Sequence, residues 1–261
     1  MAQYPIFIPV FVFIIGACIG SFLNVVIFRL PAKASIISPG SHCPACKKSI
    51  PFYLNIPVVS YLLLRGKCRF CKIPISIRYP AIEALTGIAA LMVFQKFGIS
   101  QVSVFWFIFS SALIVISFID LDHQIIHDVI SIPGIFIFAT AAFFLPEMSL
   151  ISSLSGILTG GGILYGVALA YYLLKGHQGM GGGDIKLLAM IGAATGIKGV
   201  LFTLFTGSLL GTFVGVLSII LGKMGRQMRI PFGPFLSAGA FIYLLWGENI
   251  IRWYINIIGR T

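Results

Sequence analysis

The stretch from Ile6 to Phe28 reads IFIPVFVFIIGACIGSFLNVVIF and contains no charged side chain. A helix needs about 20 apolar residues to cross the hydrocarbon core of a bilayer, so this stretch is long enough to span one. It is longer than the apolar region of a secretory signal peptide, and it lacks the basic residues before it and the small-residue cleavage site after it. We therefore expect residues 1–28 to form a retained first transmembrane helix.

The composition of the whole chain also indicates a membrane protein. Of its 261 residues, 58% are apolar and 10% are charged, and the mean hydropathy is +1.03. A soluble domain carries about 25% charged residues because its surface faces water. A soluble enzyme, a disordered protein and a disulfide-rich secreted domain are therefore excluded, and we expect an all-α polytopic membrane protein with about eight transmembrane helices. The apolar segments after the first are Pro80–Phe97, Val102–Ile119, Val129–Leu145, Ser152–Leu174, Ile185–Ile197, Gly199–Leu221 and Phe235–Ile257.

The basic residues predict the orientation in the membrane. The chain has 18 Lys and Arg against 7 Asp and Glu, a net charge of +11. Alternating spans place 14 of the basic residues on one side, including all nine from Arg29 to Arg78, and four on the other. Because basic loops stay in the cytoplasm, we expect the N-terminus outside. No basic and aromatic interleaving typical of nucleic-acid binding occurs, so we expect this charge to meet anionic lipid headgroups.

Four cysteines lie in the polar stretch after the first helix. They form two pairs, Cys43-Pro-Ala-Cys46 and Cys68-Arg-Phe-Cys71, with 21 residues between the pairs. This spacing is typical of a tetrahedral four-cysteine zinc site. Disulfides are disfavoured because the charge pattern places the loop in the reducing cytoplasm. A closed shell of four sulfurs leaves no position for water, so the predicted zinc is structural.

All four aspartates fall in two short segments, each at the cytoplasmic end of a predicted helix. The first segment holds Asp120, Asp122 and Asp128, and the second ends in Gly181-Gly-Gly-Asp184. Ionisable groups at membrane depth are costly and usually functional, and Asp120 and Asp184 directly abut apolar runs. The glycines before Asp184 permit unusual backbone conformations and the close approach of an extended substrate. Two aspartates from different helices indicate an aspartyl protease, in which one carboxylate is the base and the other is protonated.

Two other functions are compatible with the sequence. One helical face could present Asp120, His123 and His127, which with Asp184 would make a metal site of a divalent-metal transporter or a metal-dependent membrane hydrolase. A non-catalytic assembly protein of a pilus or secretion machine, docking through its zinc loop, is the other alternative. An aspartyl protease is distinguished by resistance to chelators and loss of activity in Asp120→Asn.

Several motifs in order along the chain resemble the bacterial type IV prepilin leader peptidases, which are also N-methyltransferases and belong to the GxGD class of membrane aspartyl proteases. The likeness extends over nearly the whole chain and includes both cysteine pairs. The further motifs are Gly20-Ser-Phe-Leu-Asn24-Val-Val-Ile-Phe-Arg29-Leu-Pro31, Ile77-Arg78-Tyr79-Pro80-Ala-Ile-Glu83, Asp120-Leu-Asp-His-Gln and Gly179-Met-Gly-Gly-Gly-Asp184-Ile-Lys-Leu-Leu-Ala189.

The resemblance implies two activities at the cytoplasmic face of the bacterial inner membrane. Such enzymes cut the basic leader from prepilins and pseudopilins after a glycine, then methylate the new N-terminal amine with S-adenosylmethionine. It implies catalysis by Asp120 and Asp184, because the spacing to His127 and Asp128 selects Asp120 over Asp122. His127 stands where the family usually has proline, a departure that bears on the local turn.

The same likeness suggests a division of the chain. Residues 29–79 would form the zinc loop, linked to the methyltransferase activity, and residues 80–261 the peptidase core. Glu83 and Asn24 are weak candidates for the methyl-donor site, since no nucleotide-binding fingerprint is present. Alternatively, Glu83 is a favourable charge at a helix N-terminus or a partner of Arg78.

Overall fold

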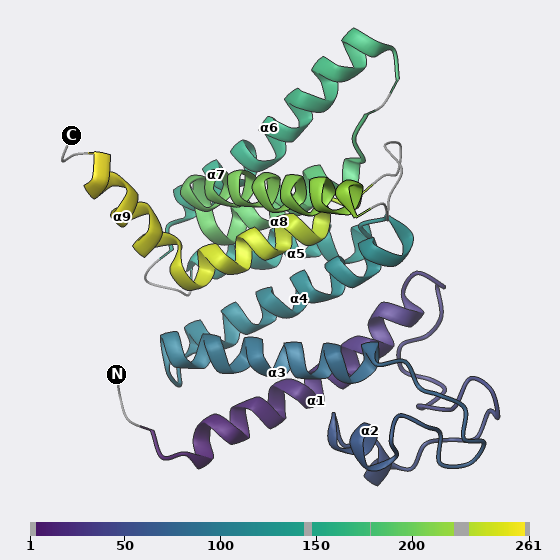
Figure 1. Cartoon of the computed structure of the whole chain (residues 1–261). Coiled ribbons are helices and arrows are strands. Elements are labelled where there is room, and N and C mark those ends of the chain that lie inside the picture. Colours follow the sequence, from purple (N-terminus) through teal and green to yellow (C-terminus); the bar gives the residue numbers. More distant parts are fainter. Residues whose placement is uncertain (1–3, 144–147, 178, 222–229, 259–261) are drawn as a thin grey trace. The chain divides into compact units, whose positions relative to one another are not determined.

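The computed structural model describes residues 4–143, 148–177, 179–221 and 230–258, and the regular elements of these residues are helices, with no β-strand among them (Figure 1). The chain divides into two compact units, Met1–Val115 and Ile116–Thr261. The helix α4 (Gln101–His123) contains the boundary between them. The all-α fold expected from the composition is confirmed.

In the first unit, α1 (Phe7–Arg29) packs along α3 (Arg78–Phe97). The contact is close because small residues line it: a Cβ built on Gly16 would lie 2.6 Å from the Cβ of Ala90, and one on Gly20 would lie 2.8 Å from the Cα of Glu83. The pairing runs antiparallel. Small residues at four-residue spacing are the usual means of close helix packing in lipid.

The segment that joins α1 to α3 is largely irregular. It contains the short 3₁₀ helix η1 (Phe52–Leu54) and the five-residue helix α2 (Val59–Leu63). Two isolated antiparallel bridges, His42 with Ser49 and Lys67 with Pro74, close a small turn around each cysteine pair. These turns place the cysteines.

In the second unit, α7 (Gly182–Ile220) is the central helix, and α5 (Asp128–Thr140), α6 (Leu150–Lys175) and α8 (Gly233–Ile242) pack against it (Figure 1). From Leu187 to Ala194 every residue of α7 is buried. A Cβ on Gly156 of α6 would lie 2.1 Å from the carbonyl oxygen of Gly192, so the two backbones touch there. The chain continues through η2 (Ala141–Phe143) after α5, and through the π-helical turn η3 (Tyr243–Gly247) and α9 (Glu248–Ile258) after α8.

The helix α7 combines two of the expected segments, Ile185–Ile197 and Gly199–Leu221. Gly196 interrupts its helical conformation with a φ of 67° and a ψ of −172°, a backbone geometry that glycine adopts without strain. Ser152 lies against this break, since its Oγ would be 2.4 Å from a Cβ on Gly196. The two expected segments are therefore one element with an internal break.

Within the described residues, six helices are long and apolar enough to cross a membrane, and α5 is apolar but shorter. The six are Phe7–Arg29, Arg78–Phe97, Gln101–His123, Leu150–Lys175, Gly182–Ile220 and Gly233–Ile258. Each of the eight expected segments overlaps a helix, and two of them fall on α7; residues 144 and 145 at the end of the segment Val129–Leu145 lie outside the described residues. The described residues thus contain six candidate spans where eight were expected, because α7 combines two segments and α5 is short. The polytopic helical architecture follows from these lengths and compositions.

Candidate functional site

The four predicted cysteines form one cluster. Their sulfur atoms all lie within 4.8 Å of one another, and none of the four is in a disulfide. The Sγ atoms of Cys43 and Cys71, which come from different pairs, are 3.7 Å apart. Four sulfurs bound to zinc at about 2.3 Å in a tetrahedron are separated by about 3.8 Å. The cluster therefore fits a tetrahedral zinc ion.

The two cysteine pairs have the same local fold. The backbone N–H of Lys47 donates to the carbonyl oxygen of Cys43 at 2.9 Å, and that of Lys72 donates to Cys68 at 3.1 Å. Both lysines follow the second cysteine of their pair and both have a positive φ, 58° for Lys47 and 60° for Lys72. Each turn thus directs its two sulfurs to the same side, as the spacing predicted.

The backbone of these turns also favours the thiolate, the form of cysteine that binds metal. The N–H groups of Cys71 and Phe70 lower the pKa of the Cys68 thiol to about 6. The N–H of Cys46 lowers the pKa of the Cys43 thiol, although burial opposes this. Each turn therefore stabilises negative charge on its first sulfur.

The predicted aspartates come together in the second unit. Asp120, in the last turn of α4, is 5% exposed, and its Oδ2 accepts a hydrogen bond from the backbone N–H of Gly233 at 3.0 Å. Asp184 is the third residue of α7 and is half-buried. The carboxyl groups of Asp120 and Asp184 interact electrostatically. Two acidic groups that are far apart in sequence thus share one partly desolvated site.

The side chain of Ile126 packs between the two glycines that flank this site. A Cβ on Gly183 would lie 2.8 Å from the Cβ of Ile126, and a Cβ on Gly233 would lie 3.2 Å from its Cδ1. Ile126 itself is 7% exposed. The helices α7 and α8 therefore both begin against one buried side chain.

The glycines before Asp184 differ from the sequence expectation. None of Gly181, Gly182 and Gly183 has a positive φ, so this segment does not use the conformational freedom expected of it. Gly183 lacks a side chain because Ile126 occupies the space, whereas a Cβ on Gly182 would meet nothing within 4 Å. The absence of a side chain at Gly183 therefore leaves space for Ile126, and at Gly182 it leaves the backbone open.

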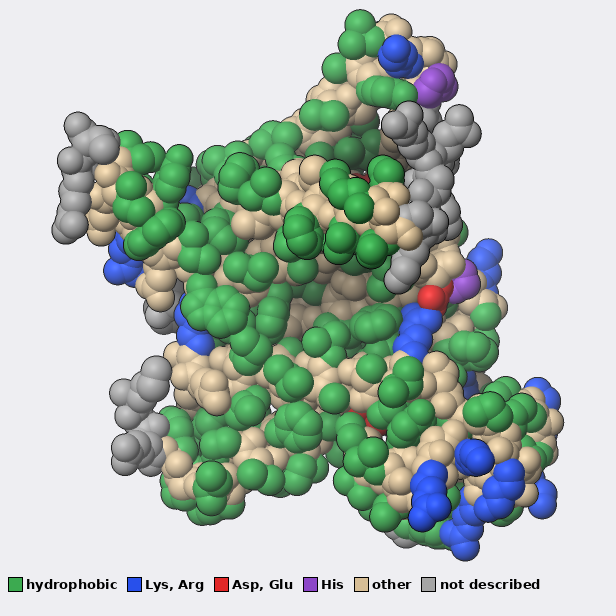
Figure 2. Space-filling view, in the orientation of Figure 1, with side chains coloured by type: hydrophobic (Ala, Val, Ile, Leu, Met, Phe, Trp, Pro, Cys, Tyr) green, Lys and Arg blue, Asp and Glu red, His purple; other side chains and the backbone are tan. Residues whose placement is uncertain are grey.

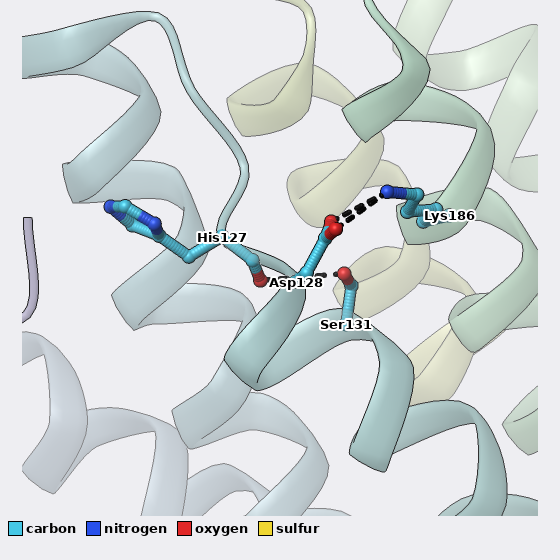
Figure 3. Close-up of polar contacts among 4 residues, drawn as sticks. All are labelled: His127, Asp128, Ser131 and Lys186. Atoms are coloured by element: carbon cyan, nitrogen blue, oxygen red, sulfur yellow. Dashed lines mark hydrogen bonds and ion pairs between the residues drawn. The ribbon is translucent and has the colours of Figure 1, made fainter.

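The third aspartate of the region, Asp128, forms an ion pair. The Nζ of Lys186 lies 2.7 Å from its Oδ1 and 2.8 Å from its Oδ2, which links the beginnings of α5 and α7. Figure 3 shows the ring of His127 pointing away from this pair, while the hydroxyl of Ser131 donates to the carbonyl oxygen of His127 at 3.3 Å. Asp128 therefore has a structural partner, and Asp122 is exposed.

The geometry does not support the alternative metal site. Within the described part of the chain, the four cysteines are the one group of three or more metal-binding side chains whose ligand atoms lie close together. His123 and His127 do not form such a group with Asp120 and Asp184. The reason is that the helix α4 ends at His123, so the helical face that was to present all three side chains does not continue to His127.

Glu83 and Asn24 connect the helices of the first unit to the loop. The Oε2 of Glu83 accepts a hydrogen bond from the backbone N–H of Val58 at 2.7 Å, and the Glu83 carboxylate also accepts one from the side chain of Ser21. Val58 has a φ of 61°, a strained conformation for a β-branched residue. Asn24 Nδ2 donates to the carbonyl oxygen of Tyr79 at 3.1 Å. Both side chains thus already hold backbone groups.

Gly233 is the site residue that the sequence analysis missed. It lies in Pro231-Phe-Gly-Pro234, immediately before an apolar run. A glycine between two prolines at a helix start was a signal that the backbone is constrained there. Nothing in the sequence indicated that this backbone contacts Asp120.

Comparison with known proteins gives a consistent result along the chain. Residues 14–97 match the bacterial peptidase A24 N-terminal domain, and residues 107–216 match the type IV leader peptidase family. A prepilin leader peptidase/N-methyltransferase of Pseudomonas aeruginosa is 35% identical, over 99% of this chain and 97% of the relative. Proteins of the same name from Aeromonas hydrophila (35% identical, 94% of this chain and 93% of the relative) and Neisseria gonorrhoeae (34%, 93% of each) are also similar. No solved structure matches.

Proposed function

Because this chain belongs to the type IV leader peptidase family, we propose that it cleaves prepilins and pseudopilins with Asp120 and Asp184, then methylates the new N-terminus with S-adenosylmethionine. The observation that carries the assignment of the aspartates is that buried Asp120, at the end of α4, and half-buried Asp184, at the start of α7, lie near enough to interact electrostatically. It is supported by the family match over residues 107–216, which contains both aspartates.

The pair of carboxyl groups suits peptide hydrolysis. One group, ionised, takes a proton from a water molecule whose oxygen attacks the scissile carbonyl carbon. The other group, protonated, donates its proton to the carbonyl oxygen as negative charge develops there. Collapse of the tetrahedral intermediate breaks the C–N bond, the proton held by the first group passes to the leaving amine, and one hydroxyl of the intermediate returns its proton to the second group as the carboxylic acid product forms. The reaction needs two carboxyl groups in different protonation states, which close approach of like charges produces.

The experiment is co-expression of each variant with a prepilin, followed by mass measurement of the pilin N-terminus. We expect no leader removal in Asp120→Asn and Asp184→Asn, and removal in the exposed neighbour Asp122→Asn. Adding a chelator should leave cleavage by the wild type intact. Normal cleavage by Asp120→Asn would refute the assignment, and loss of cleavage on chelation alone would favour a catalytic metal instead.

We assign residues 1–28 to the first transmembrane helix, 29–79 to a zinc loop that serves the methyltransferase activity, and 80–261 to the peptidase core. The tetrahedral fit of the four sulfurs supports zinc. Glu83 and Asn24 lie where the loop meets the helices, so they are proposed to shape the methyl-donor site. Weaker binding of S-adenosylmethionine by Glu83→Gln would support this role, and unchanged binding would refute it.

The charge pattern supports an inner-membrane protein with its N-terminus outside and its aspartates at the cytoplasmic face. Within the zinc loop, seven Lys and Arg are exposed (Figure 2), together with Ile37 and Leu63, which are 88% and 78% exposed. This combination suits a surface of anionic lipid headgroups. Three of the other basic residues behind the orientation, Lys223, Arg226 and Arg229, lie outside the described residues.

A reporter fused after Lys48 should be cytoplasmic, and one fused after Glu147, which also lies outside the described residues, should be external. The reverse result would overturn the orientation and with it the cytoplasmic site. Crosslinking of the loop to anionic lipid should fall when Lys47 and Lys48 are both changed to Gln. Unchanged crosslinking would argue against headgroup contact.

A further inference from the structure

The two carboxyl groups of the site differ in their hydrogen bonding. Oδ2 of Asp120 accepts the backbone N–H of Gly233 at 3.0 Å. Within the described residues, no hydrogen-bond donor reaches the carboxylate of Asp184, whose interactions are burial and repulsion from Asp120. A donor fixed on one carboxylate stabilises the negative charge there and leaves the other group as the place for the proton.

The donor is part of a helix beginning. Gly233 is the first residue of α8, a helix of ten residues with a proline in its first turn. The first N–H groups of a helix have no partner inside the helix, and the beginning of a helix carries partial positive charge. Asp120 thus supplies the acceptor for a backbone N–H that is otherwise unpaired, and α8 supplies a favourable field for a carboxylate.

We propose that Asp120 is the ionised base of the pair, that Gly233 is the positioning residue that holds it in that state, and that Asp184 carries the proton. The assignment rests on the proposed function. Asp120 then takes the proton of the attacking water with its second oxygen, Oδ1, while Oδ2 stays on Gly233. Asp184 donates its proton to the scissile carbonyl oxygen.

Glycine is required at position 233 because there is no space for a side chain. A Cβ there would lie 2.6 Å from Oδ2 and 3.3 Å from Cγ of Asp120, and 3.2 Å from Cδ1 of Ile126. The flanking Ile126 is buried and cannot easily yield. Any larger residue therefore displaces either the carboxylate or the start of α8.

The charged groups of the neighbouring helices do not replace this contact. Asp184 approaches Asp120 from the start of α7, and in its ionised form it would carry the same sign of charge. Asp128 at the start of α5 is paired with Lys186 of α7, so each offsets the charge of the other. Among the described residues, the hydrogen bond to the Asp120 side chain comes from the backbone of α8, at Gly233.

The test compares Gly233→Ala with Gly239→Ala. Gly239 is a matched control because it also lies on α8 in a tight contact but away from Asp120: a Cβ there would lie 2.6 Å from Oγ1 of Thr206 and 2.9 Å from the carbonyl oxygen of Thr203. For Gly233→Ala we expect a fall in kcat of about tenfold or more, the size expected when a hydrogen bond to a charged group is lost, with KM unchanged. The acid limb of the pH–rate profile should move to higher pH, because the ionised base is then less favoured.

Methylation of a mature pilin should be unchanged in this variant. Gly239→Ala should keep the wild-type profile.

A second variant removes only the N–H. Glycolic acid at position 233 replaces the Phe232–Gly233 amide by an ester and adds no atom, so it tests the hydrogen bond even if Gly233→Ala does not fold. We expect the same fall in kcat and the same shift of the acid limb. A wild-type rate and profile for the ester variant would overturn the proposal, as would a change in KM alone. Asp120→Asn and Asp184→Asn in the same assay separate the outcomes: if both are inactive while the ester variant is normal, the dyad stands and only the role of Gly233 fails.

Discussion

The cysteine cluster and the aspartate site are built in different ways. Each cysteine pair lies within one tight turn, and the two turns repeat the same backbone hydrogen bond and the same positive φ. The aspartate site joins the end of α4 to the starts of α7 and α8, with Ile126 packed between the last two. The first site depends on local geometry, and the second depends on helix packing over most of the second unit. Changes at the two sites should therefore affect different activities.

The largest expected effect is on cleavage. Asp120→Asn and Asp184→Asn should each reduce leader removal by about 1000-fold or more, which is within the range for loss of a general acid or base. Methylation of a supplied mature pilin should change by no more than about twofold, because methyl transfer needs a bound donor and an unprotonated amine but no pair of carboxyl groups. The measurement is the mass of each pilin after incubation with S-adenosylmethionine.

The matched control for this prediction is Asp122→Asn, which alters an exposed acid of the same helix. Should Asp122→Asn lose cleavage while Asp120→Asn keeps it, the choice between them is wrong. Loss of methylation in both Asp120→Asn and Asp184→Asn would show that the two sites are not separable.

An effect of middle size is expected at the cysteines. Changing Cys43 and Cys46 together to Ser should remove the bound zinc, since two thiolates are too few to hold a closed tetrahedral site. The change should reduce methylation, or destabilise the loop, more strongly than it reduces cleavage. Elemental analysis and both assays are the measurements, with Cys18→Ser as control because this cysteine is free and outside the cluster. Zinc that persists in the double variant, or that is absent from the wild type, would contradict the prediction.

The same contrast explains how far the sequence could predict the molecule. The apolar runs predicted the helices, because a length of about 20 apolar residues is a local property. The spacing of Cys43, Cys46, Cys68 and Cys71 predicted their cluster for the same reason. The catalytic role of the two aspartates was predicted from their place beside apolar runs and from the family resemblance, and it stays a prediction; nothing local showed that the two side chains lie near each other. Their proximity follows from the packing of α4, α7 and α8.

The features that the sequence did not predict all depend on contacts between distant segments. Gly233 became significant only when α8 was placed against Asp120. Gly183 was expected to provide backbone freedom, and instead it provides space for Ile126. The two expected spans 185–197 and 199–221 are one helix, α7, which is interrupted at Gly196 and then continues. A single glycine permits such an interruption. A glycine in a sequence does not by itself indicate whether it allows a close contact, leaves space for a neighbouring side chain or permits a break in a helix.

The smallest expected effect is at the ion pair of Asp128 and Lys186. This pair lies at the starts of α5 and α7, near the aspartate site, but we assign it no part in proton transfer. The two side chains are 56% and 40% exposed, and an exposed ion pair contributes about 0.2–1 kcal/mol. Asp128→Asn and Lys186→Met should therefore each lower the cleavage rate by about fivefold or less, by loosening the start of α5 against α7. The double variant should have nearly the same cleavage rate as either single variant, because removing one partner already abolishes the ion pair. Lys198→Met, on the same helix beyond the break at Gly196, is the control for loss of a positive charge. A single variant as inactive as Asp184→Asn would instead place Lys186 or Asp128 in contact with the substrate, and the site would then consist of more than two aspartates.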